Sequence, residues 1–208
     1  MNFRTKLQAA WAALAFLSIG VALYAAIAYG FLPLGANVQP EMRAVYEQHP
    51  AGIYLHVFGS IFALALGPFQ FSSRLRARQL NLHRWMGRLY LGVGVLVGGL
   101  AGLYMSRYAH GGPVAQAGFG ALALAWIYTG ARAFDAIRGG ETLEHRKWMI
   151  RNFSLAFAAV TLRLYLPIPV VAGVAFASAY AVIAWACWLP NLAFAEWWIR
   201  RHPIRAAG

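Results

Sequence analysis

The chain has 208 residues, of which 61% are hydrophobic and only 12% are charged. An ordinary soluble domain is about half apolar and roughly a quarter charged, so this composition excludes a soluble monomer. The 18 Lys and Arg residues against 6 Asp and Glu residues give a net charge of +12, which fits a nucleic-acid binder or a membrane protein with basic loops. The single cysteine, Cys187, excludes an internal disulfide and a cysteine-based zinc site.

Six segments are apolar enough to cross a bilayer, which takes roughly 20 helical residues. In chain order they are about 7–32, 52–71, 86–104, 114–136, 149–167 and 170–196.

Arg4 and Lys6 precede the first segment, as in a signal peptide, but its apolar run is about twice the usual signal core, which favours an uncleaved anchor. Pro167-Ile168-Pro169 predicts a tight turn between the last two spans. Pro68 and Pro190 lie near the predicted span ends, so we expect no break in the middle of a span. The expected fold is an all-α integral membrane protein, a bundle of six transmembrane helices in a single domain over residues 1–208.

The loop charges predict the orientation of the chain. With the N-terminus inside, fifteen of the eighteen Lys and Arg residues fall in inner segments, Arg43 and Arg107 in outer segments and Arg163 within a span. Such an excess of cations is typical of cytoplasmic loops. We therefore expect a multi-pass protein of the bacterial inner (plasma) membrane with both termini in the cytoplasm. Its partner is then the lipid bilayer, and nucleic acid is not expected to bind.

Catalytic motifs of soluble enzymes are missing from the sequence. It has no Gly-rich phosphate loop with a Lys, no Gly-x-Ser-x-Gly elbow and no His-Glu-x-x-His motif. The six acidic residues are dispersed along the chain, so they predict no two-carboxylate or two-metal site. Hydrolase chemistry of the soluble type is not expected, and whether the chain is an enzyme stays open.

Polar residues in or near the spans are the candidates for function, because ionisable groups are costly in a bilayer. At helical spacing, His56 and Gln70 share one face of the second span, and His145, Asn152 and Arg163 share one face of the fifth. Their depths predict two layers, an inner one with His83, His145, Gln70 and Asn152 and an outer one with His56, His110 and Arg163.

The layered histidines give the first functional hypothesis, which is b-type haem binding and transmembrane electron transfer. A transmembrane haem needs two neutral imidazoles from different helices and cations near its propionates. His83 and His145 form an inner candidate pair. His56 and His110 form an outer one, although Gly111-Gly112-Pro113 predicts a loop beside His110. Haem b is then the expected cofactor, with a redox partner or a homo-oligomer. The span order of these histidines is similar to that of the cytochrome b561 family. A histidine at the end of a span is also a common interfacial residue.

Five motifs between His56 and Asn191 occur together. They are Gly67-Pro68-Phe69-Gln70-Phe71, Leu82-His83-Arg84-Trp85-Met86-Gly87-Arg88-Leu89-Tyr90, Glu144-His145-Arg146-Lys147-Trp148-Met149-Ile150-Arg151-Asn152, Thr161-Leu162-Arg163-Leu164-Tyr165 and Trp188-Leu189-Pro190-Asn191. In combination they resemble the bacterial membrane family catalogued as domain of unknown function 2306. The resemblance implies a polytopic membrane protein whose activity is not assigned. The polar positions that it implies are His56, Gln70, His83, His145, Arg163 and Asn191, and His110 is not among them.

Two further hypotheses remain open. A transporter or receptor for a small anionic or lipid-like ligand would bind the anionic group with Arg163 and His56 near the outer face. This requires that Arg163 faces the bundle, whereas a long side chain near a span end also reaches outward to lipid headgroups. A non-catalytic assembly subunit would instead pack against partners through glycine faces such as that of Gly94 and Gly98.

Overall fold

A computed structural model describes residues 3–202, and every regular element between them is a helix. Six helical segments are long and apolar enough to cross a membrane: Thr5–Gly30, Pro50–Gln70, Leu80–Ser106, Gly112–Arg138, Thr142–Ala172 and Phe176–Arg201. The predicted all-α bundle of six spans is thus confirmed. The spans extend beyond their predicted limits at one end or both, and the longest extensions, at the starts of Leu80–Ser106 and Thr142–Ala172, are rich in polar and basic residues that continue the helix.

The spans are built from shorter helices. They are α1 (Phe3–Gly30), α3 (Pro50–Gln70), α5 (Leu80–Leu89) with the π-helical η1 (Tyr90–Val97) and α6 (Gly98–Ser106), α7 (Gly112–Arg138), α8 (Thr142–Ala156) with α9 (Ala158–Tyr165) and α10 (Pro167–Ala172), and α11 (Phe176–Ala186) with α12 (Leu189–Arg201). Two further helices, α2 (Pro40–Gln48) and α4 (Ser73–Arg78), lie outside the spans.

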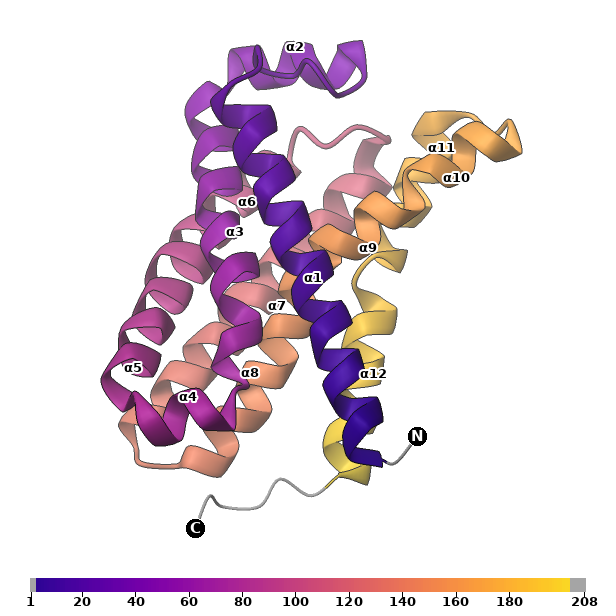
Figure 1. Ribbon diagram of the computed structural model, residues 1–208. Helices are drawn as coiled ribbons and strands as arrows, with labels where there is room; N and C mark the ends of the chain where they lie inside the picture. The colour runs from indigo at the N-terminus through magenta and orange to yellow at the C-terminus, as the bar shows by residue number, and fades with distance from the viewer. Residues whose placement is uncertain (1–2, 203–208) are drawn as a thin grey trace.

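The bundle has two distinct ends. Figure 1 shows α2 lying across one end, and α4 near the other, where α1 begins and α12 ends. We call these the α2 end and the basic end. The cations that define the basic end lie on α4, on the ends of α7 and α12 and on the starts of α5 and α8: Arg74, Arg76, Arg78, Arg84, Arg138, Arg146, Lys147, Arg200 and Arg201. Both described ends of the chain therefore lie at the same end of the bundle, as expected for a chain with an even number of spans. The side of the membrane that the basic end faces stays a prediction.

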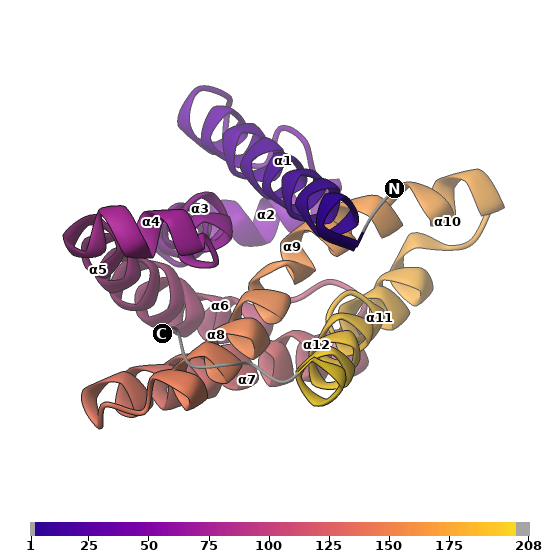
Figure 2. The same cartoon turned by 60° about the horizontal axis from the view of Figure 1, so that its bottom comes forward.

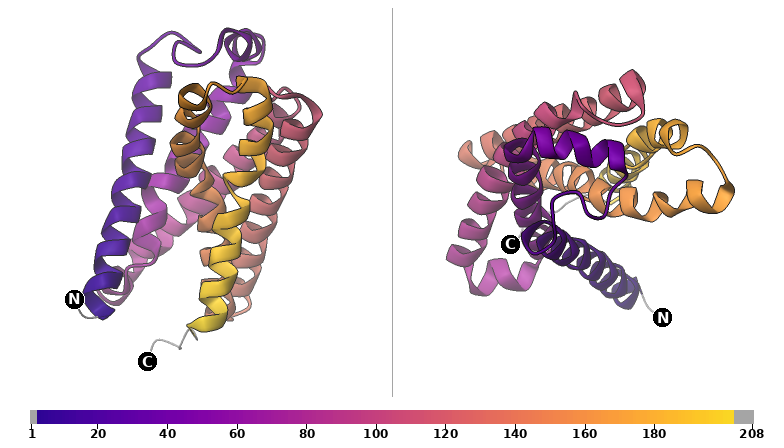
Figure 3. Two further views of the ribbon diagram at one scale, coloured as in Figure 1. Left: turned by 90° about the vertical axis from the view of Figure 1, so that its right-hand side faces the viewer. Right: turned by 90° about the horizontal axis from the view of Figure 1, so that it is seen from above.

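The helices pack around a core at the meeting of η1, α7 and α8. Tyr90, Asn152 and Leu155 are almost fully buried there. α1 packs mainly on α3, α8 lies between α7 and α12, and α11 packs on α7 (Figure 2). α1 lies on the outside of the bundle (Figure 3), and its Phe16 side chain is 77% exposed. Apolar side chains on such outer faces fit contact with lipid, because a bilayer does not penalise their exposure.

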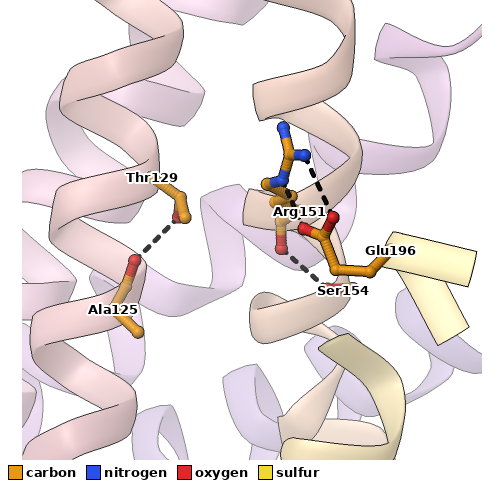
Figure 4. A network of polar contacts seen from close by, with 5 residues as sticks. All are labelled: Ala125, Thr129, Arg151, Ser154 and Glu196. Atoms are coloured by element: carbon orange, nitrogen blue, oxygen red, sulfur yellow. Dashed lines mark hydrogen bonds and ion pairs between the residues drawn. The ribbon is translucent and has the colours of Figure 1, made fainter. Parts of the chain in front are cut away.

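An ion pair joins α8 to α12. The Arg151 guanidinium donates to both carboxylate oxygens of Glu196, with Nη2 3.1 Å from Oε2 (Figure 4). Arg151 also lies 4.6 Å from the centre of the Trp148 ring. Both charges are partly buried, and the planar fork of arginine suits a carboxylate. The pair links the last helix to the bundle through two charge-assisted hydrogen bonds.

Close packing of α3 on the third span depends on small residues. A Cβ on Gly59 would lie 2.8 Å from the Cα of Gly98. A Cβ on Gly94 would lie 3.0 Å from the Cβ of Ala63. Small residues allow the backbones of membrane helices to approach in this way. The glycine face of Gly94 and Gly98 is thus covered by α3 of the same chain, so it is not free to bind a partner protein.

Two spans are interrupted near their middles, so the expectation of unbroken helices is wrong for them. The fifth is broken at Phe157 and the sixth at Cys187 and Trp188, whereas the third stays continuous but passes through the π-helical η1. Pro190 explains the last break, because the sixth span runs over Phe176–Arg201 and places this proline near its middle. Neither the break at Phe157 nor the π-helical η1 contains a proline, so the sequence carries no simple signal for them.

The broken sixth span keeps its backbone paired. The carbonyl of Cys187 accepts hydrogen bonds from the Thr161 hydroxyl and from Nδ2 of Asn191, the latter at 3.0 Å. Side chains that satisfy freed carbonyls are what allow a helix to break within a bilayer. Thr161 and Asn191 therefore stabilise the break.

The predicted turn at Pro167-Ile168-Pro169 is also wrong. The helix restarts at Pro167 as α10, and the chain turns at residues 173–175, where Gly173 has a φ of 64°. Pro167 and Pro169 lie in the first turn of α10, where an N–H has no partner within the helix and its loss costs little. Gly173 ends the helix because glycine adopts the left-handed conformation without strain.

Candidate functional site

A cavity of about 240 Å³ lies in the half of the bundle nearest α2. Its walls come from α1, α2, α3, α6, α7, α8, α9 and α11, and most of the lining side chains are apolar. The polar side chains along its walls include Ser60 and His56 of α3, Tyr46 of α2, Arg163 of α9 and His110 of the loop between α6 and α7. Apolar walls with a few convergent polar groups are typical of small-molecule sites.

The roof of the cavity is α2. Met42, Val45 and Tyr46 line the cavity, whereas Arg43 and Glu47 are exposed and form an ion pair of 2.8 Å. Burial raises the pKa of the Tyr46 phenol well above its usual range, so this phenol keeps its proton. No helix was predicted over Pro40–Gln48. The apolar spacing of Met42, Val45 and Tyr46 is the local signal for this helix.

Arg163 faces the cavity from α9. Its side chain is half-buried, its Nη1 donates to the carbonyl of Ala159 at 2.9 Å, and its guanidinium lies 5.6 Å from the centre of the Tyr24 ring on α1. Arg163 forms no ion pair with any residue between 3 and 202, and the cavity lining contains no Asp or Glu. Most of its hydrogen-bond donors therefore remain available.

His56 and Ser60 add polar groups one turn apart on α3. Nδ1 of His56 lies 2.9 Å from the Gly98 carbonyl. Since a carbonyl only accepts hydrogen bonds, Nδ1 carries the proton and Nε2 is the free nitrogen. The ring packs against Gly102, where a Cβ would lie 2.7 Å from Nδ1. The buried hydroxyl of Ser60 has no hydrogen-bond partner among the described residues. The cavity thus holds unused hydrogen-bonding groups.

His110 lines the same cavity from the loop between α6 and α7. Its ring centre lies 5.6 Å from that of Phe176 and 6.3 Å from that of Tyr180, both on α11. The structure therefore brings the three predicted outer residues, His56, His110 and Arg163, to one cavity.

The predicted inner residues lie elsewhere. His145 places Nδ1 2.8 Å from the Ala133 carbonyl, and Nδ1 of His83 is buried without a partner among the described residues. Gln70 ends α3 near them at the basic end. Asn152 is fully buried and uses its amide in hydrogen bonds within the core, so it does not reach the cavity. Within residues 3–202, no group of three or more His, Cys, Asp or Glu side chains could hold a metal ion.

Six apolar spans around an internal cavity define a polytopic helical membrane protein. The sequence matches the family described as predicted membrane protein (DUF2306) over residues 53–199. The chain belongs to this family, as its motifs indicated. The matched stretch holds nearly all of α3 through α12, and it leaves α1 and the roof α2 outside. Neither the curated proteins nor the solved structures gave a match, and the likeness to the cytochrome b561 family is not confirmed.

Proposed function

We propose that the chain binds a small amphiphilic anion in the cavity beneath α2, as a transporter or a receptor. The observation that carries this proposal is Arg163, a cation that faces a mainly apolar cavity and has no acidic partner among the described residues. A charge at the centre of a bilayer costs about 2.5–3.5 kcal/mol or more. A bound anion would offset part of this cost.

The lining suggests the chemistry of the ligand. The arginine fork suits a carboxylate, to which it donates two parallel hydrogen bonds. His56 and Ser60 lie in the same cavity and supply further polar contacts. Apolar side chains such as Ile53, Leu64 and Leu162 form most of the remaining wall, which favours a ligand with a hydrocarbon body. The ligand class is therefore a medium-chain carboxylate or a similar lipid-like anion.

Transport is supported by the position of the broken helices. Ala156 and Ala158, on either side of the break at Phe157, line the cavity, and so does Cys187 at the break of the sixth span. Discontinuous spans often form the substrate sites of transporters, because interrupted helices allow one part of the bundle to move against another. If the basic end faces the cytoplasm, as the loop charges predict, this cavity lies nearer the outer face of the membrane.

The substitution Arg163→Gln tests the proposal with decanoate as the probe and decanol as its uncharged analogue. Binding is measured by equilibrium dialysis of the protein in lipid nanodiscs. A hydrogen bond to a charged group contributes about 1.5–3 kcal/mol, so decanoate should bind at least about tenfold more weakly to the variant. Decanol should bind weakly and equally to both proteins.

The control is Arg107→Gln. Arg107 is an exposed cation at the same end that does not line the cavity, and its guanidinium lies over the Tyr104 ring. Its loss should leave decanoate binding within about twofold, which is less than 0.5 kcal/mol. Equal binding of decanoate and decanol to the wild-type protein would contradict the proposal, as would unchanged decanoate binding in Arg163→Gln.

Haem b stays a prediction for the pairs His83 with His145 and His56 with His110. Nδ1 of His56 and of His145 each lies near a backbone carbonyl, and Nε2 is then free, as in many haem ligands. The purified protein should show a Soret band that His83→Ala or His145→Ala reduces. The absence of this band after haem is added, or normal haem content in both variants, would reject electron transfer and with it the expected redox partner.

A further inference from the structure

A second polar cluster lies at the basic end, where α3, α4 and α5 meet. Gln70 at the end of α3 is only 7% exposed, and its Nε2 has no hydrogen-bond partner among the described residues. Arg76 of α4 donates from Nη1 to the backbone carbonyl of Gln70 at 2.9 Å. His83 of α5 contributes the buried Nδ1 that also lacks a partner in the described chain. Two buried polar nitrogens and a guanidinium thus have hydrogen-bonding capacity that the protein itself does not use.

Local structure holds these three side chains together. The Ser72 hydroxyl accepts a hydrogen bond from the Leu75 N–H at 3.2 Å and so caps α4, which turns Arg76 back toward Gln70. The Oε1 atom of Gln70 lies against Gly87, where a Cβ would come within 3.3 Å. Gly87 follows His83 by one turn of α5, so Gln70 packs on the helical face that carries His83.

The charges around the cluster favour an anion. Burial, together with the nearby guanidinium of Arg146, lowers the pKa of Arg76, which still remains charged. Arg76 forms no ion pair with any described residue. Glu144 at this end is paired with Lys147 at 2.6 Å. The other acidic residues near the basic end lie apart from the cluster: Asp135 and Glu141 share a groove with Arg132 and Trp148, and Glu196 pairs with Arg151.

We propose that Gln70, Arg76 and His83 bind a phosphate group at the basic end of the bundle. Phosphate oxygens accept hydrogen bonds from the arginine fork, from an amide N–H and from an imidazole N–H, and these are the three groups present. Arg76 and His83 are half-buried, so the site faces the surface of the bundle. Basic pockets at this depth between spans bind lipid head groups. The phosphate is that of an anionic phospholipid or inorganic phosphate, and this site is separate from the cavity beneath α2.

The test measures phosphate binding to the full chain in two arms. In one, native mass spectrometry counts phosphatidic acid retained by protein from micelles that also contain phosphatidylcholine. In the other, equilibrium dialysis measures inorganic phosphate. We expect Arg76→Gln to weaken whichever ligand binds by at least about tenfold, since it removes a charge-assisted hydrogen bond. The matched control is Arg78→Gln, an exposed cation on the same helix, which should leave binding within about twofold.

A second variant separates ligand loss from misfolding. Gln70→Glu keeps the size of the side chain and puts a negative charge on the residue whose backbone carbonyl Arg76 contacts, so the new carboxylate would repel a bound phosphate. It should abolish phosphate binding while the thermal unfolding midpoint stays the same or rises. Retention of phosphatidic acid alone would identify a headgroup site, and binding of inorganic phosphate would identify a free-anion site. Binding of neither ligand, or equal losses in Arg76→Gln and Arg78→Gln, would overturn the proposal. Decanoate binding in the cavity should be unchanged in both Arg76→Gln and Gln70→Glu.

Discussion

Replacing Asn152 by leucine is expected to lower the free energy of unfolding by about 2–4 kcal/mol. The Asn152 side chain is fully buried and accepts a hydrogen bond from the Tyr90 hydroxyl at 2.7 Å. Its Nδ2 donates to the Trp126 carbonyl at 2.7 Å and to the Thr129 hydroxyl at 2.9 Å. Hydrogen bonds between membrane helices average about 0.6 kcal/mol and reach about 1.7 kcal/mol. Leucine would remove all three and leave the buried Tyr90 hydroxyl without its acceptor, whereas the Trp126 carbonyl and the Thr129 hydroxyl keep their bond to each other.

The measurement is a titration with sodium dodecyl sulfate in mixed micelles, with Ser154→Ala as the control. Among the described residues, the Ser154 hydroxyl bonds only to the Arg151 carbonyl one turn before it, at 2.7 Å (Figure 4). Its loss should therefore change stability by less than about 0.5 kcal/mol. In Tyr90→Phe we expect a loss of about 1 kcal/mol that is not additive with Asn152→Leu. A loss in Asn152→Leu no larger than that in Ser154→Ala would contradict the structural role of this network.

Asn152 shows where prediction from sequence stops. Its helical spacing with His145 correctly indicated an inward-facing position, because a polar side chain in a bilayer turns away from lipid. Helical spacing does not show whether such a side chain contacts other polar groups or lines a cavity. Asn152 meets three partners from η1 and α7 that saturate its amide, whereas Arg163 on the same predicted stripe meets a cavity. The break at Phe157 also separates the two parts of this stripe. Only the packed structure distinguishes the core residue from the candidate site residue.

The fold was more predictable than the site, since hydropathy depends on local composition. Six long apolar runs were enough to predict six spans. The roof α2 was missed because its apolar face is short, and the turn at Gly173 was missed because Pro167 suggested a stop where it begins a helix. The π-helical η1 was not predicted, because its apolar residues match an ordinary α-helical span and carry no signal for a wider hydrogen-bond spacing. His56, His110 and Arg163 were each predicted for an outer layer, but their common cavity depends on walls from α1 to α11.

Replacing Gly59 by alanine is expected to force α3 away from the third span and to lower stability by about 1–3 kcal/mol. A Cβ at this position would lie 2.8 Å from both the Cα and the N of Gly98. These are backbone atoms, so no side-chain rotation relieves the contact and one helix must move. The hydrogen bond of 2.9 Å from His56 to the Gly98 carbonyl crosses the same interface. Decanoate binding in the cavity should therefore weaken together with stability.

Gly92→Ala is the matched control for Gly59→Ala, because nothing lies within 4 Å of a Cβ at Gly92. Alanine is favoured over glycine in helices by up to about 1 kcal/mol, so this control should be neutral or slightly stabilising. Both variants are compared by the same detergent titration and by decanoate dialysis. Equal stability of the two would show that α3 and the third span are not in backbone contact at Gly59. A loss of stability in Gly59→Ala with unchanged decanoate affinity would instead separate the packing of this interface from the ligand site.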